Sequence, residues 1–238
     1  MFAFLAIVAI IGLVVTAAIY SYKKNQARIG ALVSLAHSKG WQFAPHDPFG
    51  LPGRWGGAPF NAGYDRRAAN VITGEHDGKP FVAFDYSYKE DSRDSEGKTT
   101  TRTYCFAIVA LGMPCALPEL HVGPEGVFSR IGRVMGMQDI ELESEDFNRA
   151  FRVRCPNPKL ATDILSPRTM EALLANGKIR FRMVGSDILA YENGNLDAVE
   201  VLRCAHVLSE VIDGVPQFVW RDYGLYDRPV TPSQGNAS

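Results

Sequence analysis

The chain has 238 residues, of which 46% are hydrophobic and 21% are charged, and its formal net charge is −1. This balance predicts a folded chain with its own core rather than a disordered one. Because the chain has no overall basic field, the composition argues against a nucleic-acid partner.

The four cysteines (Cys105, Cys115, Cys155 and Cys204) are widely spaced in the sequence. Cys105 and Cys204 lie within apolar runs, so we expect them to be small buried hydrophobic side chains in a reducing compartment. An even number of cysteines also allows two disulfides in an oxidising compartment.

The run from Phe2 to Tyr20 contains neither a charge nor a proline. A helix of this length rises about 28 Å, which is close to the ~30 Å hydrocarbon core of a bilayer. We therefore predict a transmembrane anchor over residues 1–22, with the lipid bilayer as its partner. A cleaved signal peptide is the first alternative, although it would need a basic segment before the apolar run. A buried core helix is the second alternative.

The basic residues beside the run predict an orientation. Lys23, Lys24 and Arg28 all follow it in the sequence. Since positive charges favour the cytoplasmic side, we expect the amino terminus outside and the domain in the cytoplasm. A protein partner would then meet the domain at the inner face of the membrane.

A juxtamembrane helix is expected over residues 23–40. Ile29, Leu32 and Ala36 recur at helical spacing, and Gly40 is a typical stop signal. This helix either continues the membrane helix or begins anew. Its apolar stripe is expected to dock on the domain, with a partner protein as the alternative.

Residues 41–224 are expected to form a soluble domain, and residues 225–238 a disordered tail. A short strand at 41–44 precedes a loop at 45–63 that is rich in proline and glycine. The glycines resemble a phosphate cradle, but the Lys-Ser/Thr pair and the following helix of such a cradle are missing. We therefore expect an ordered wrapping loop held by Trp55 and Phe60.

The next segment predicts antiparallel strands. Asp77-Gly78 separates two β-rich runs, residues 70–76 and 81–88, which is a strong hairpin signal. A third strand at 100–111 is apolar on both faces and is expected at the centre of the sheet. The charged residues 89–98 are expected to form a mobile tip.

Helix-start signals dominate the second half. Ser144, Asn157-Pro158 and Ser166-Pro167 each precede a short amphipathic pattern. The other expected elements are a strand at 117–122, a helix at 126–136, a strand at 140–143, a hairpin at 178–192, a closing helix at 197–213 and a docked segment at 218–220. Together they predict an α+β fold built on antiparallel hairpins, with the helices mostly in the second half.

The stretch of residues 140–174 resembles a bacterial family of membrane-anchored proteins classed as a domain of unknown function. The matching positions are Phe147, Phe151, Val153, Leu165, Ser166, Pro167, Met170, Glu171 and Leu174. Weaker likenesses at 70–74, 84–86 and 218–224 extend it over most of residues 41–224. The resemblance implies a membrane anchor, but it brings no catalytic or binding residue.

The sequence contains no motif of the common hydrolases, nucleotide-binding loops or zinc sites, so we assign no catalytic, cofactor-binding or metal residue. His46-Asp47 is a candidate acid–base pair, although neighbouring loop side chains usually point apart. Cys105 is a poor nucleophile if the central strand buries it. The acidic cluster of Glu141, Glu143, Glu145 and Asp146 is better explained as a solvated helix start than as a metal site.

Three arginine pairs are candidate contacts for anionic headgroups, and each is otherwise a solvated face: Arg66 with Arg67, Arg130 with Arg133, and Arg180 with Arg182. Arg130 and Arg133 are the preferred binding residues. They are neighbours on a helix at i, i+3, and the surrounding sequence is otherwise apolar. Pairing with the acidic residues just downstream is the alternative.

These observations favour a single-span membrane protein with a cytoplasmic, non-enzymatic binding or scaffold domain. The alternative is a membrane-associated hydrolase with a site around His46, Asp47 and the glycine-rich loop. A structure should separate the two, because an enzyme brings polar titratable side chains together in a pocket.

Overall fold

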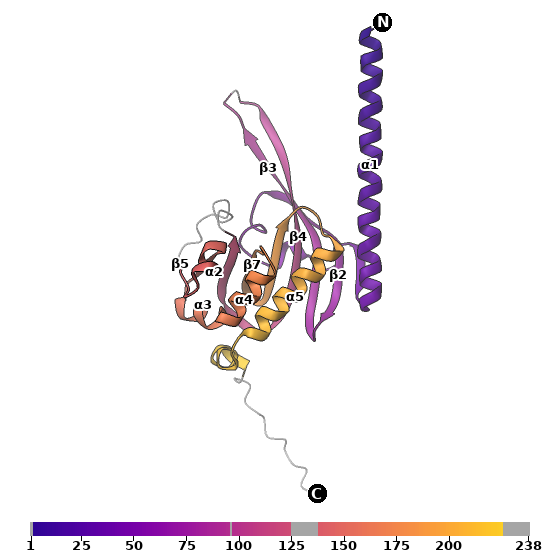
Figure 1. Ribbon diagram of the computed structural model, residues 1–238. Coiled ribbons are helices and arrows are strands. Elements are labelled where there is room, and N and C mark those ends of the chain that lie inside the picture. Colours follow the sequence, from indigo (N-terminus) through magenta and orange to yellow (C-terminus); the bar gives the residue numbers. More distant parts are fainter. Residues whose placement is uncertain (1, 96, 125–137, 226–238) are drawn as a thin grey trace.

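The computed structural model describes residues 2–95, 97–124 and 138–225 (Figure 1). Within these residues, a seven-stranded antiparallel sheet is packed with helices, which confirms the expected α+β class. The strands are β1 (Gln42–His46), β2 (Tyr64–His76), β3 (Lys79–Arg93), β4 (Thr99–Pro124), β5 (Gln138–Ile140), β6 (Phe151–Cys155) and β7 (Phe181–Asn193). The helices are α1 (Phe2–Lys39), α2 (Glu145–Ala150), α3 (Pro158–Ile164), α4 (Pro167–Ala175), α5 (Ala198–Gly214) and α6 (Gln217–Trp220).

Strand β4 is the centre of the sheet, in the order β1-β2-β3-β4-β6-β5 with β7 also paired to β4. Residues 106–112 of β4 pair with residues 187–193 of β7, and residues 117–122 pair with 181–185. Strand β7 turns at Gly185, where φ is +57°, and the amide of Tyr191 donates to the carbonyl of Arg180 at 3.1 Å. The expected hairpin at 178–192 is therefore present within one continuous strand, and the expected strand at 117–122 is the far half of β4.

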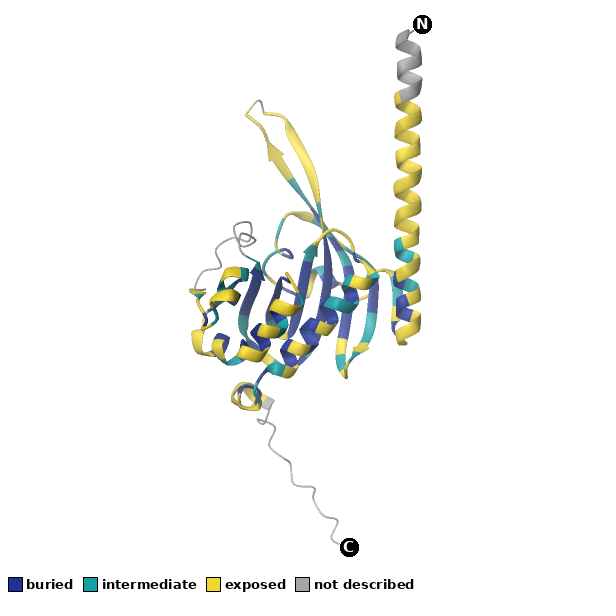
Figure 2. Ribbon diagram, viewed as in Figure 1, coloured by how far each residue is buried: buried dark blue, intermediate teal, exposed yellow. Residues whose placement is uncertain are grey.

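The two faces of the sheet bury separate cores. On one face, the helices cover residues such as Phe81, Ala83 and Leu111. On the other, the loop between β1 and β2 covers Phe84 and Tyr86. This alternation along β3 follows from the geometry of a strand, because successive side chains point to opposite faces. Figure 2 shows the buried strands between these two layers.

The loop at 45–63 is ordered and wraps the sheet as expected. The Trp55 ring stacks on Phe84 with their centroids 5.9 Å apart, and Phe60 lies 4.8 Å from Tyr86. Both loop aromatics are buried. The Asp77-Gly78 turn is also confirmed, since φ is +50° and +72° at these two residues and β2 pairs with β3 around them.

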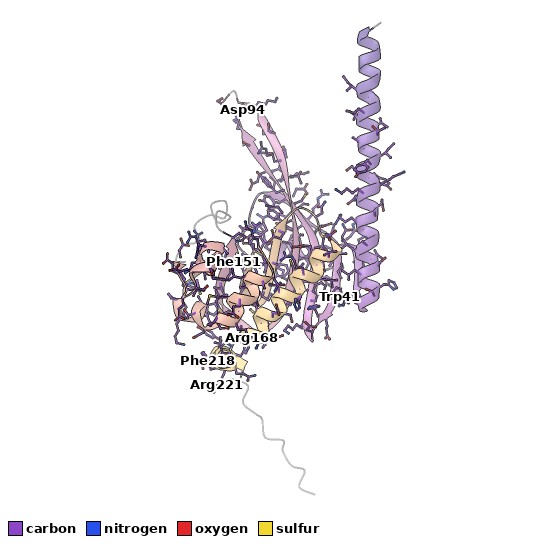
Figure 3. All side chains as sticks on the ribbon, viewed as in Figure 1. Trp41, Asp94, Phe151, Arg168, Phe218 and Arg221 are labelled. Atoms are coloured by element: carbon purple, nitrogen blue, oxygen red, sulfur yellow. The ribbon has the colours of Figure 1, made fainter. Side chains whose placement is uncertain are left out.

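The charged segment 89–98, which we expect to be a tip, is in part regular structure, because residues 89–93 belong to a strand. Strand β3 continues to Arg93 and β4 begins at Thr99, and these two residues are paired. Backbone pairing does not depend on apolar side chains, and the threonines at 99–101 favour strands. We name residues 89–103 the arm; it projects from the sheet with Asp94 at its tip (Figures 1 and 3).

The helix-start signals of the second half are confirmed by their hydrogen bonds. Side-chain oxygens of Ser144, Asn157, Ser166 and Asp197 accept amides of the first turns of α2, α3, α4 and α5. At the end of the chain, Val219 and Trp220 of α6 are buried, whereas Phe218 is partly exposed. The expected docking of residues 218–220 is thus correct for two of the three side chains.

Helix α1 is continuous from Phe2 to Lys39 and ends at Gly40, where φ is +69°. Its last turns dock on the domain through Leu32, Leu35 and Ala36, which are buried in the core under the helices. Its amino-terminal part stands away from the domain, on the side to which the arm projects (Figures 1 and 2). No helix in the described part of the chain is both long enough and apolar enough to cross a membrane.

A clamp around Asp85 fixes α1 to the sheet. Arg28 lies 3.0 Å from the Asp85 carboxylate and donates to the carbonyl of Leu196 at 2.8 Å. The same carboxylate accepts the amide of Leu196 at 2.6 Å and the side chain of Asn70 at 2.7 Å. One carboxylate thus joins α1, β2, β3 and the segment before α5.

Replacing Asp85 with alanine should destabilise the protein by about 3 kcal/mol, because it leaves a largely buried Arg28 without its ion partner. Urea unfolding followed by circular dichroism measures this loss. The control is Asp65→Asn, whose ion pairs with Arg67 and Lys89 are exposed and whose unfolding midpoint should stay close to wild type. Equal midpoints for the two variants would contradict the clamp.

Candidate functional site

Two candidates from the sequence have different outcomes. Arg130 and Arg133, with the expected helix at 126–136, lie outside the described residues and stay a prediction. Asp47 is described, and both of its carboxylate oxygens accept backbone amides, from Phe49 at 2.8 Å and from Leu51 at 2.7 Å. This carboxylate holds the start of the wrapping loop, which makes it a structural residue rather than the partner of a catalytic His46.

The third arginine pair is not a solvated face. Arg182 is 0% exposed and Arg180 is 8% exposed. Arg182 is covered by the wrapping loop, whose Gly56 carbonyl accepts a hydrogen bond from its guanidinium, and Arg180 packs on the Tyr191 ring. The coverage is non-local, because residues 56–60 lie far from β7 in the sequence.

Arg182 is enclosed by the loop and by β4. Its Nη2 donates to the carbonyl of Gly56, and its guanidinium lies 5.5 Å from the centre of the Phe60 ring. Its Nη1 is 3.6 Å from Glu119 Oε1, an ion pair that is too long for a hydrogen bond. Burial lowers the pKa of the Arg182 guanidinium from its ordinary value, although Tyr191 and Glu119 partly oppose this shift.

Gly57 permits the close contact between the loop and Arg182. Its φ is +72°, and a Cβ at this position would lie 2.5 Å from Arg182 Nη1. Any larger residue would strain the backbone and displace the guanidinium. The absence of a side chain at Gly57 therefore permits the burial of Arg182.

Glu119 is held by two basic groups. His121 Nε2 lies 2.7 Å from Glu119 Oε1, and Arg182 Nη1 lies 3.6 Å from the same oxygen. The hydrogen bond from His121 is the main cause that lowers the pKa of the Glu119 carboxyl, against the opposing effect of burial. The carboxylate is therefore ionised at neutral pH and is already engaged with His121.

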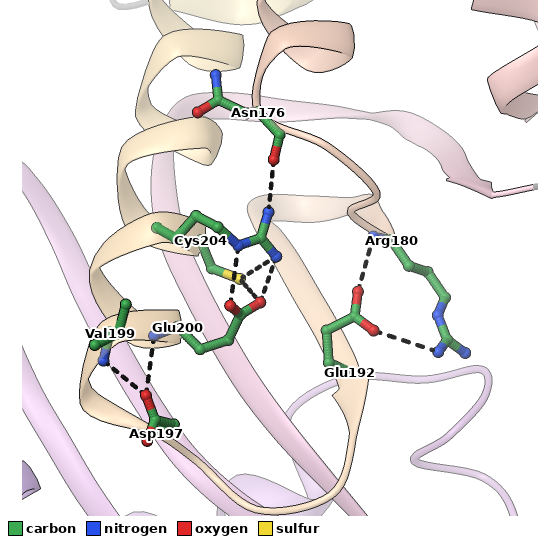
Figure 4. Close-up of polar contacts among 8 residues, drawn as sticks. Asn176, Arg180, Glu192, Asp197, Val199, Glu200 and Cys204 are labelled. Carbon is green, nitrogen blue, oxygen red and sulfur yellow. Dashed lines mark hydrogen bonds and ion pairs between the residues drawn. The ribbon is translucent and has the colours of Figure 1, made fainter.

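Arg180, Tyr191 and Glu192 complete the group on β7. The Arg180 guanidinium lies 4.8 Å from the centre of the Tyr191 ring, and its Nη2 is 3.8 Å from Glu192. Glu192 also accepts the backbone amide of Arg180 at 3.2 Å, as Figure 4 shows. Burial raises the pKa of both Tyr191 and Glu192. We name Glu119, His121, Arg180, Arg182, Tyr191 and Glu192 the arginine cluster.

The arginine cluster has donors without acceptors. Among the described residues, five buried side-chain nitrogen or oxygen atoms have no hydrogen-bond partner, and four belong to the cluster. They are Nε of Arg180, Nε and Nη1 of Arg182 and the hydroxyl of Tyr191. Such atoms are rare in folded proteins, so a concentration of them in one place requires an explanation.

The chemistry of the cluster is that of binding. It holds guanidinium and phenol donors, and its two carboxylates are engaged with basic or amide groups. No group of three metal-ligating side chains is found among the described residues. The arrangement can hold an acceptor-rich group in place, and it offers no activated nucleophile.

A cleft of about 230 Å³ lies beside the loop and is lined by Phe49, Leu51 and Val82, among others. Arg54 and Asp187 line one wall and form a two-point ion pair at 3.0 and 3.1 Å. Trp55 Nε1 also donates to Asp187 at 2.9 Å. Because Arg54 and Asp187 neutralise each other, this cleft is a weaker candidate for binding a polar ligand than the arginine cluster is.

The cysteines differ from expectation at one position. Cys105 is exposed although it lies in the central strand, because it faces outward where the sheet narrows into the arm. Cys155 and Cys204 are buried, and burial raises the pKa of both thiols. Cys204 lies beside the Glu200–Arg203 ion pair at the start of α5 (Figure 4). All four cysteines are free thiols.

Reaction with a thiol reagent should distinguish these cysteines. Cys105 should react fastest in the native protein, and Cys155 and Cys204 should react only after unfolding, because a buried thiol does not form the reactive thiolate. Absorbance with Ellman's reagent measures the phases. The Cys105→Ser variant should lose the fast phase, and a fast phase that persists in it would contradict the assignment.

Replacing Glu119 with glutamine should destabilise the protein in a pH-dependent way. A carboxyl whose pKa is lowered on folding stabilises the protein above its ordinary pKa of 4.5, and this contribution disappears as the pH falls through the folded value. The difference in Tm between wild type and Glu119→Gln should thus shrink between pH 7 and pH 3. Glu171→Gln, an exposed carboxylate on α4, is the control and should show little difference at either pH.

No protein-family model matches the chain, and no curated protein matches it in sequence at a significant level. The resemblance to a membrane-anchored bacterial family therefore stays a prediction. Among solved structures, the crystal structure of the mycobacterial trehalose monomycolate transport factor A is similar, with a TM-score of 0.57 and 14% sequence identity. The match covers 79% of this chain and 96% of that chain. At this identity the likeness is one of fold.

Proposed function

We propose that the chain is a non-enzymatic binding or scaffold module that α1 holds at a lipid membrane. The observation that carries the proposal is the exposed apolar surface of α1. Ile10, Leu13 and Val14 are 62%, 72% and 60% exposed, and the domain covers none of them. A surface of this kind usually marks an interaction with a membrane or a protein.

The distribution of these side chains favours lipid over one partner protein. Ile10, Ile11, Leu13, Val14, Val15 and Ile19 are all exposed. At 100° per residue they are spread over about two thirds of the helix circumference, whereas a helix that docks on one surface needs only one narrower apolar stripe. Lipid chains surround a helix completely, so they satisfy this pattern.

Two further observations support a role at a membrane. The uncharged run from Phe2 to Tyr20 is followed by Lys23 and Lys24, which favours an amino terminus outside and a cytoplasmic domain. The fold is also that of a protein named as a transport factor for trehalose monomycolate. We propose that this chain likewise serves lipid handling by binding, and the donor-rich arginine cluster fits such a role better than catalysis.

Membrane fractions should contain the full chain, and washing them with alkaline carbonate should not release it. Leu13→Arg with Val14→Arg should move the protein to the wash, because each charge in a hydrocarbon environment costs about 2.5–3.5 kcal/mol. Val199→Arg is the matched control, since Val199 is an apolar residue of the domain that is 76% exposed. Full release of the wild type by carbonate would contradict the membrane anchor.

A reporter fused after Ser238 tests the orientation. A reporter enzyme that works only in the cytoplasm should be active when it is fused at this position. Activity of a reporter that works only in the periplasm would overturn the orientation.

Purification from solubilised membranes tests the scaffold role. A partner in stoichiometric amount, retained by the full chain, supports it.

A further inference from the structure

We propose that the arginine cluster binds an oxyanion, the phosphate group of a lipid headgroup or of a free phosphate, and that the loop around Gly56-Gly57 closes over it. This inference deepens the proposed function, on which the lipid source of the phosphate rests. The proposal rests on the buried hydrogen-bond donors of the cluster that lack acceptors.

The first step is the number of donors that lack acceptors. A guanidinium has five N–H groups, and Arg182 makes a hydrogen bond only through Nη2, to the carbonyl of Gly56. Its Nε and Nη1, with Nε of Arg180 and the hydroxyl of Tyr191, are buried without a hydrogen bond. A buried donor that lost its water and gained no acceptor is unfavourable, so these atoms are a place for an acceptor-rich group.

The second step is that the carboxylates of the cluster do not saturate the arginines. Glu119 is hydrogen-bonded to His121 and remains 3.6 Å from Arg182. Glu192 accepts the amide of Arg180 and remains 3.8 Å from its guanidinium. A phosphate offers several acceptors at once, and guanidinium forks bind such groups in a two-point geometry.

The third step is access. The wrapping loop is anchored by Trp55, whose Nε1 donates to Asp187, and by the buried ring of Phe60. Between these two anchors, Gly56 accepts one hydrogen bond from Arg182, and Gly57 has no side chain. This short glycine segment covers the arginine and is held by the hydrogen bond from Arg182 and by the amide of Asn61, which donates to the carbonyl of Gly57 at 2.9 Å. Its displacement would break these two hydrogen bonds and open the cluster.

The fourth step is position. Asn193, which follows Tyr191 and Glu192, is paired with Phe106 at the end of the sheet where the arm begins. The arm and the amino-terminal part of α1 project from this same side (Figure 1). A membrane that holds α1 as proposed would therefore lie on the side of the sheet at which Tyr191 and Glu192 are found. This placement favours a lipid phosphate over a free one.

The test uses the full chain in detergent micelles and isothermal titration calorimetry. The probes are inorganic phosphate and dihexanoyl phosphatidic acid, with dihexanoyl phosphatidylcholine as the lipid control. Tighter binding of phosphatidic acid than of either other probe supports the lipid source, and equal binding of inorganic phosphate supports the free source. Failure of both phosphate probes to bind would overturn the proposal and leave water as the partner of the buried donors.

Variants connect binding to the cluster. Arg182→Gln should weaken phosphate binding about 100-fold, because a charge-assisted hydrogen-bond pair is lost. Tyr191→Phe removes only an unpartnered hydroxyl, so it should fold normally and weaken binding about 5-fold. The controls are Arg168→Gln, an exposed arginine on α4 (Figure 3), and Tyr64→Phe, and both should bind as wild type does.

Each outcome of the variants has one meaning. If Arg182→Gln fails to fold, Tyr191→Phe decides alone, and unchanged binding in Tyr191→Phe then overturns the proposal. Binding that is equally weakened in the controls also overturns it. Since the titration needs no membrane, its failure is separate from release of the protein by carbonate, which concerns the anchor.

Discussion

The pairing of β4 with both halves of β7 is the constraint on which the rest of the domain depends. β4 is a single long strand, yet each of its two halves pairs with one half of the β7 hairpin. This arrangement lets β4 also carry β3 on one side and β6 on the other. It sets the separate cores on the two faces, and it brings Glu119 of β4 beside Arg182 of β7.

The elements that the sequence predicts well are those with local signals. The turn at Asp77-Gly78 and the capping residues Ser144 and Ser166 act on their nearest neighbours, so their effect is readable in a short window. The alternation along β3 is also local, because it follows from the geometry of a strand.

The errors of sequence reasoning at the candidate site concern contacts between distant segments, whereas the error at residues 89–98 concerns local backbone pairing. Arg182 has the pattern of an exposed strand residue, and only the loop near Gly57 makes it buried. Cys105 lies in an apolar run but is exposed, because the sheet narrows there. Tyr191, Glu119 and Glu192 carry no motif at all. The one sequence signal for this site is a pair of arginines on alternate residues together with adjacent glycines in a wrapping loop.

The clamp between Arg28 and Asp85 has a mechanical consequence. The Asp85 carboxylate accepts four hydrogen bonds at the junction of α1 and the domain, and Leu32 and Leu35 of α1 are packed in the core. The helix and the domain are therefore joined without a flexible linker. A domain held at a membrane in this way cannot tumble on its tether. With α1 in a bilayer as proposed, the domain would keep one tilt toward the membrane while it rotates about the membrane normal, so the same end of the sheet would always face the lipid.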